Sequence, residues 1–173
     1  MGLYKVYNGP APTTAVLAPV TTGTNIKTML QIKLGGSTNQ IGTIVKYGCS
    51  FDGSAAATPG KVELLSTKTV GATITEFVAA DVVNMGDPNA AAVTDDFPLA
   101  FTASGDESGY TATAEGSITA TRLFDAQLIA PTNQFVFEWA LGREAKFRND
   151  EYVRIRMHFA TAINAICWIE FEV

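Results

Sequence analysis

Hydrophobic and polar residues alternate with a period of two along much of the chain, most clearly in its last quarter. Val153, Ile155, Met157 and Phe159 occupy alternate positions, with arginine or histidine at all three positions between them. Residues 165–173 repeat the alternation after a short turn. This period is typical of strands with one buried face, so the sequence predicts two strands here.

Similar patterns upstream predict six further strands. They lie at residues 26–34, 41–51, 61–67, 72–78, 118–128 and 135–141, with glycine-, proline- or asparagine-rich turns between several of them. No segment has the pattern of a convincing amphipathic helix. About eight strands separated by turns indicate an all-β domain with the architecture of a two-sheet sandwich or a barrel.

Two segments depart from this pattern. Residues 1–24 carry three prolines and a single charge, which predicts an extended N-terminal arm lying on its own domain or on a neighbour. We expect this arm to find few partners on a lone subunit and to become ordered in an assembly. Residues 25–173 form the predicted sandwich domain. Within it, residues 79–117 hold seven acidic residues and no lysine or arginine, which predicts an acidic, loop-rich insertion.

The composition narrows the classes of partner. Only 17% of the residues are charged, against about 25% in average soluble chains, so the surface is suited to packing against other protein. A net charge of −5 argues against nucleic acid as a partner. The longest apolar run is too short to span a membrane. No signal peptide is recognisable, and two cysteines make no disulfide framework, so we expect folding in the cytosol.

The sequence indicates no catalytic, cofactor or metal site. Nucleophilic catalysis needs a nearby base, and the single histidine, His158, lies on the polar face of a predicted strand. Cys49 and Cys167 lie on apolar faces and are expected to be buried free thiols, although a disulfide stays open if their strands face each other. Four acidic residues of the insertion could be considered as calcium ligands, namely Asp87, Asp95, Asp96 and Asp106. Their spacing is not that of a known calcium-binding loop, so a solvated acidic loop is favoured over a calcium site.

Basic residues crowd the loop before the last two strands. Arg143, Lys146 and Arg148 lie within it, and Arg154 and Arg156 follow just beyond. They are either ordinary solvated charges or a positive patch that meets an acidic partner surface, such as residues 79–117 of a neighbouring copy.

Several strings resemble a group of small tailed-phage and prophage structural proteins, over nearly the whole chain. They are residues 47–59 (YGCSFDGSAAATP) followed by Val62-Glu63-Leu64, then residues 124–127 (FDAQ), 130–134 (APTNQ) and 141–144 (LGRE). Gly60 stands where this group leads us to expect a larger β-branched residue. The group is similar to jelly-roll capsid decoration (cement) proteins, which sit as trimers at threefold sites of the shell.

The resemblance implies a jelly roll of about eight strands. We expect strand 41–51 and the last strand to be central, because both are long and each carries a continuous apolar face. It implies a protein made in the host cytoplasm that binds the phage major capsid protein at the capsid surface of the virion, with no enzyme activity and no cofactor. The alternative is a head-fibre or tail-tip adsorption module that binds host surface glycan through aromatic residues such as Tyr110 or Trp139.

Three sets of residues are the candidates for partner binding. Ile166 and Trp168 lie on the outward face of the last strand, and exposed large apolar residues mark interfaces, so we expect a homotrimer. The second set is the basic group Arg143, Lys146 and Arg148. The third comprises the apolar residues of the arm, which are Leu3, Tyr4, Val6, Tyr7, Val16 and Leu17.

Overall fold

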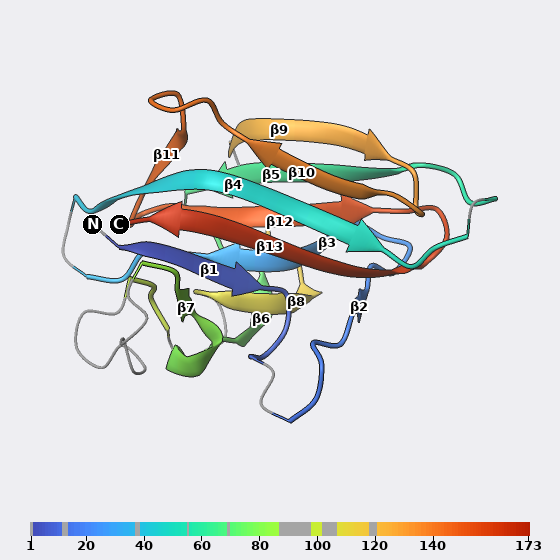
Figure 1. The fold of residues 1–173 in the computed structure, drawn as a ribbon, viewed down its shortest axis with the longest axis horizontal. Helices are drawn as coiled ribbons and strands as arrows, with labels where there is room; N and C mark the ends of the chain where they lie inside the picture. Colours follow the sequence, from blue (N-terminus) through green and yellow to red (C-terminus); the bar gives the residue numbers. More distant parts are fainter. Residues whose placement is uncertain are drawn as a thin grey trace.

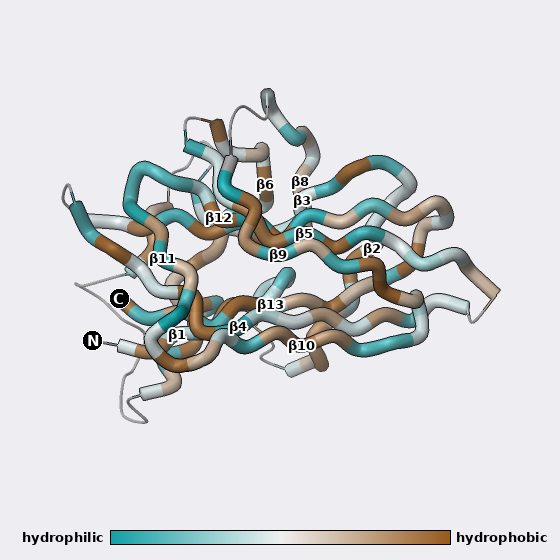
Figure 2. Tube along the Cα trace, turned by 90° about the horizontal axis from the view of Figure 1, so that it is seen from above, coloured by the Kyte–Doolittle hydropathy of each residue, from teal (hydrophilic) through white to brown (hydrophobic). Residues whose placement is uncertain are grey.

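The alternating segments pair into two antiparallel sheets that pack face to face (Figures 1 and 2). The computed structural model describes residues 2–11, 14–36, 39–54, 56–68, 70–86, 98–101, 107–117 and 121–173. Within these ranges the only helix is a single 3-10 turn, Ala79–Asp81, and no helix is long and apolar enough to cross a membrane.

The first sheet has the strand order β10-β4-β13-β1-β7, with β2 paired to β13 and β11 paired to β4. Its strands are β1 (Leu3–Tyr7), β2 (Val20–Thr21), β4 (Ile41–Phe51), β7 (Val83–Asn84), β10 (Gln134–Glu138), β11 (Ala145–Arg148) and β13 (Asn164–Glu172). The second sheet has the order β6-β8-β3-β12-β5-β9. Its strands are β3 (Lys27–Ile32), β5 (Gly60–Thr67), β6 (Thr73–Glu76), β8 (Gly109–Ala114), β9 (Thr121–Ile129) and β12 (Tyr152–His158).

Eight of these strands form nested antiparallel pairs. Strand β1 pairs with β13, β3 with β12, β4 with β10, and β5 with β9. One long hairpin rolled on itself produces this nesting, and it gives the sheet orders β1-β13-β4-β10 and β3-β12-β5-β9. This is the connectivity of a jelly roll. The predicted all-β sandwich is therefore confirmed, as are the central positions of β4 and β13.

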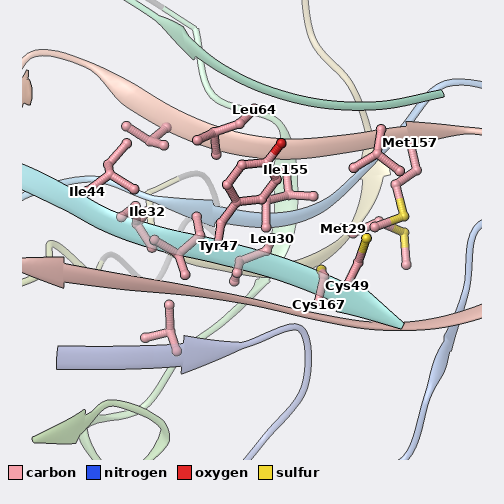
Figure 3. Packing of buried hydrophobic residues seen from close by; sticks show 14 of the residues in the cluster. Met29, Leu30, Ile32, Ile44, Tyr47, Cys49, Leu64, Ile155, Met157 and Cys167 are labelled. Carbon is pink, nitrogen blue, oxygen red and sulfur yellow. The ribbon is translucent and has the colours of Figure 1, made fainter. Parts of the chain in front are cut away.

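The core lies between the two sheets and is built from the apolar faces of their strands. Tyr47 of β4 reaches from the first sheet towards the second, and its hydroxyl donates to Asp125 Oδ2 of β9 at 2.7 Å (Figure 3). Gly60 of β5 lies against the ring of Phe159, which fills the space that a Cβ at this position would need. A β-branched residue at this position would therefore require the ring of Phe159 to move.

A β-bulge at Met29 changes which residues of β3 face the core. Leu30 pairs with Ile155, but Arg156 pairs with Thr28, so Met29 is an extra residue in the ladder. Strict alternation would place Ile26 and Thr28 on the same face as Leu30. After the bulge, Thr28 instead pairs with outward-facing Arg156, and Ile26 is 49% exposed.

The predicted N-terminal arm is largely part of the sandwich, which corrects our expectation that it has few partners on a lone subunit. Residues 3–7 form the first jelly-roll strand and pair with five residues of β13. Val6 is fully buried in the core. The side chain of Asn8, also buried, donates to the carbonyl of Ala165 and accepts from the N–H of Cys167. Val20–Thr21 pairs with β13 as well.

The outer face of the second sheet is partly covered by its own chain, around the buried side chain of Arg154. This guanidinium donates to Thr67 Oγ1 at 3.0 Å, to the carbonyl of Val70, and to the carbonyl of Glu115 at 3.2 Å. Burial lowers the pKa of Arg154. The sequence pattern placed Arg154 on a polar face, but the segments near residues 70 and 115 shield it from solvent.

Parts of the acidic insertion belong to the sheets. Residues 109–114 form β8, and Leu99 is buried and bridges to Leu34. Three of its carboxylates are used within the domain. Asp81 accepts from the N–H groups of Ala11 and Val78, Glu107 pairs with Lys33, and Glu115 accepts from Thr28. The four residues considered for calcium, Asp87, Asp95, Asp96 and Asp106, lie outside the described residues.

Candidate functional site

Strands β9, β10 and β11 lie along one side of the sandwich (Figure 1), and exposed apolar residues occur on β9, on β10 and in the loop between β10 and β11. Strands β9 and β10 are the outermost strands of their sheets on this side. Leu123, Leu128, Val136 and Leu141 are 58%, 71%, 48% and 97% exposed. Four half-buried aromatic rings pack against the hydrophobic core next to them. They are Phe124 of β9, Phe135 and Phe137 of β10, and Trp139 just after β10. We call these eight residues the apolar edge.

The outward face of β13 is less exposed than the sequence suggested. Ile166 and Trp168 are both half-buried. The indole of Trp168 lies over Gly48 of β4, where an added Cβ would come within 2.6 Å of the ring. Lys5 Nζ lies 4.1 Å from the ring centroid. The predicted cluster of exposed apolar residues on this strand is therefore wrong, and such residues are found on the apolar edge instead.

A charged row beside Trp168 holds β1, β13 and β4 together. Glu170 is only 6% exposed and accepts from Lys5 at 2.9 Å and from Lys46 at 3.1 Å. Burial opposes the charge of Lys5, but hydrogen bonds and charges of Glu170 and Tyr7 outweigh this effect, so the pKa of Lys5 is raised. These ion pairs therefore serve to join three strands of the first sheet.

The other arm candidates divide by exposure. Leu3, Tyr4, Tyr7 and Leu17 are half-buried against the domain, and the ring of Tyr4 stacks on Phe171. Val16 is 90% exposed. Val6 is buried in the core and is therefore unavailable to a partner, as noted above. Of the arm residues chosen from the sequence, only Val16 offers most of its surface to a partner.

The basic residues of β11 line a hollow of about 370 Å3 at the margin between the two sheets. Lys146 and Arg148 are exposed on one side of this short strand, while Phe147 between them is buried beneath the hollow. Two cations of the second sheet also line this hollow, Arg122 on β9 and Lys68 just after the end of β5. We call this site the basic hollow, and its lining is Ile41, Lys68, Arg122, Lys146, Phe147, Arg148 and Glu151.

Buried Glu151 organises the floor of the basic hollow. Its carboxylate accepts from Arg122 Nη2 at 2.7 Å and from the N–H of Arg148 at 3.0 Å. Arg122 also donates to the carbonyl of Lys146. Among the described residues, neither Lys146 nor Arg148 forms a side-chain ion pair, so the hollow carries uncompensated positive charge.

The structure thus separates the basic group that the sequence suggested. Lys146 and Arg148 share the hollow, whereas exposed Arg143 does not line it. Arg156 pairs with Glu63 on the outer face of the second sheet, and Arg154 is buried. Sequence reasoning missed Lys68 and Arg122 because they come from segments distant in the chain.

Neither cysteine has the setting of a reactive thiol. Cys49 and Cys167 are register partners on β4 and β13, both buried and both free. Burial raises the pKa of Cys49 to about 12 and also raises that of Cys167. No group of three His, Cys, Asp or Glu side chains in the described ranges is placed to hold a metal ion.

The aromatic residues considered for glycan binding pack against other rings. Trp139 contacts Phe137 and Tyr47, with ring centroids 4.8 and 6.1 Å apart. Tyr110 packs against Phe77 at 5.6 Å. Both residues are half-buried.

No protein family matches the chain, and no curated protein or solved structure shows significant similarity to it.

Proposed function

We propose that this protein is a structural virion protein that binds the outside of an assembled phage capsid as a homotrimer at threefold sites. The apolar edge is the observation that carries the proposal. Four exposed aliphatic residues and four half-buried rings follow two strands with no further strand beside them in the described part of the chain. Such an edge is a template for association unless it is covered. The jelly roll also agrees with the fold that the sequence resemblance implies.

In this proposal the basic hollow provides the contact to the shell. Lys146 and Arg148 have no carboxylate partner among the described residues, so an acidic surface of the capsid protein would complement them. The site would span several shell subunits, and binding therefore requires assembled shells rather than free capsid protein.

The shell contact is tested by cosedimentation with assembled shells. Reversing both charges (K146E/R148E) should abolish or strongly weaken binding. The single reversals K146E and R148E should each weaken it, while R143E makes the same change of charge as either of them outside the hollow and should bind normally. Imaging of virions with and without the protein locates it. Density at the tail tip, or equal binding to free capsid subunits, would overturn the proposal.

The subunit contact is tested separately by sedimentation. The double variant L128K/V136K places two charges on the apolar edge and should shift the trimer towards monomer. V78K changes another exposed residue, 62% exposed and outside this edge, and should leave the trimer intact. A wild-type protein that is monomeric at micromolar concentration would contradict the trimer.

A further inference from the structure

Two adjoining hollows lie on the outer face of the second sheet, opposite to the core. One, of about 210 Å3, lies over β12 and β5, and the other, of about 250 Å3, lies over β5 and β9. Lys61 and Glu63 line both. We call the two together the sheet groove, and the residues that matter here are Ile26, Lys61, Glu63, Leu128, Arg156 and His158.

The strand register explains why a groove forms at this place. Lys61 pairs with Leu128 on one side and with His158 on the other. In the next outward row, Glu63 pairs with Arg156 and with Ala126, whose short side chain leaves space beside Leu128. The bulge at Met29 exposes Ile26 at the far end. The groove therefore has an apolar residue at each end and charged residues between them.

The charges in the groove do not balance. Arg156 Nε donates to Glu63 Oε2 at 2.7 Å, so the one carboxylate is already neutralised. Lys61 and His158 are exposed, and neither forms an ion pair within the described ranges. The guanidinium has five N–H donors, and only Nε has a described side-chain partner. The Nη groups of Arg156, Lys61 Nζ and the imidazole of His158 are therefore the donors that the groove offers.

We propose that the sheet groove binds a carboxylate side chain of a partner polypeptide, flanked by apolar side chains that cover Leu128 and Ile26. A carboxylate accepts hydrogen bonds from Arg and Lys with good geometry. Glu63 disfavours a polyanion, because a second charge would lie against its carboxylate, and this argues against a nucleic-acid backbone. Strands β5 and β12 lie within the sheet, so the donors are held on a rigid surface.

The test is an NMR titration of the isotope-labelled full chain with two peptides, Ac-Ala-Leu-Glu-Leu-Ala-NH2 and its glutamine counterpart. We expect shifts centred on residues 61, 156 and 158, with binding of the glutamate peptide roughly fivefold tighter than that of the glutamine peptide. K61Q/H158Q should weaken this preference without unfolding, since Arg156 remains as a donor and neither replaced side chain forms a described ion pair. R143Q alters an exposed cation outside both the groove and the basic hollow, and should keep the preference.

Three results would overturn the inference. They are equal affinity for the two peptides, shifts centred elsewhere on the chain, and no shift at millimolar peptide. Shells are absent from this titration, so its outcome does not depend on the proposed shell contact. Leu128 also belongs to the apolar edge, and sedimentation of the same sample shows whether subunit association covers that end of the groove.

Discussion

Replacing Tyr47 by phenylalanine should destabilise the protein by removing one hydrogen bond between the two sheets. Tyr47 is fully buried on β4, and its hydroxyl donates to Asp125 Oδ2 of β9 at 2.7 Å. The other carboxylate oxygen of Asp125 accepts from Gln127 Nε2 and from the N–H of Ala126. The variant keeps the ring and its contacts with Phe135, so it creates almost no cavity. Only the hydrogen bond is tested.

The size of the expected loss in the free energy of unfolding follows from the charge of the acceptor, the carboxylate of Asp125. A hydrogen bond to a charged group contributes about 1.5–3 kcal/mol. In a domain of this size, 1 kcal/mol corresponds to a change in Tm of roughly 2–4 °C, so Y47F should melt about 3–12 °C lower at neutral pH. Y152F is the matched control, because Tyr152 only accepts a 3.4 Å contact from Lys33. A Y47F variant within about 0.5 kcal/mol of wild type would refute the reasoning.

The same residue gives a signature at high pH. Burial, followed by the hydrogen bond and charge of Asp125, raises the pKa of Tyr47 well above the usual value of 10.0. The folded state therefore keeps a proton that the unfolded state loses, so this contribution to stability is complete below pH 10 and declines as the pH rises further. Tyrosinate absorbance should show one of the five tyrosines ionising only on unfolding. Y47F should remove that component, and its persistence would contradict the assignment.

Three further predictions concern the core and its first strand. Cys49 and Cys167, with raised pKa values, should react with Ellman's reagent at pH 8 only after unfolding, and rapid native reaction would contradict their burial. G60V should cost about 1–3 kcal/mol in chemical denaturation because the added carbons clash with Phe159, whereas unchanged stability would show that this site relaxes. Deleting residues 2–8 should destabilise the isolated domain, since strand β1 is lost; a deletion that melts like wild type would restore the view of this segment as a mere arm.

The strands found from the sequence are those in which apolar and polar residues alternate clearly. All eight predicted segments contain strands, since such alternation is the pattern of a half-buried strand. Strand β1 instead has apolar residues on both faces, with Tyr7 outward and Val6 inward. Its partner lies at the opposite end of the chain, and no local pattern reveals that. The neighbouring prolines then suggested an arm.

The candidate binding surfaces were less predictable from the sequence, because they depend on contacts between distant segments. Alternation correctly gave Arg154 an outward direction, but only the fold shows that the chain near Val70 covers it. Trp168 is outward as expected, yet Gly48 on the neighbouring strand allows the indole to lie flat. The alternation of Lys146 and Arg148 around Phe147 was the one local signal of the basic hollow.

The energetics of the apolar edge connect subunit association with shell binding. Covering the exposed parts of Leu123, Leu128, Val136 and Leu141 contributes on the order of 4–8 kcal/mol per subunit. Association costs roughly 4–15 kcal/mol in lost translational and rotational freedom, so a trimer held by these side chains alone is marginal. In the proposed trimer, three basic hollows would raise the effective concentration of each for a symmetric shell site. Charge reversal in the hollow should therefore weaken trimers on the shell more than it weakens trimers in solution.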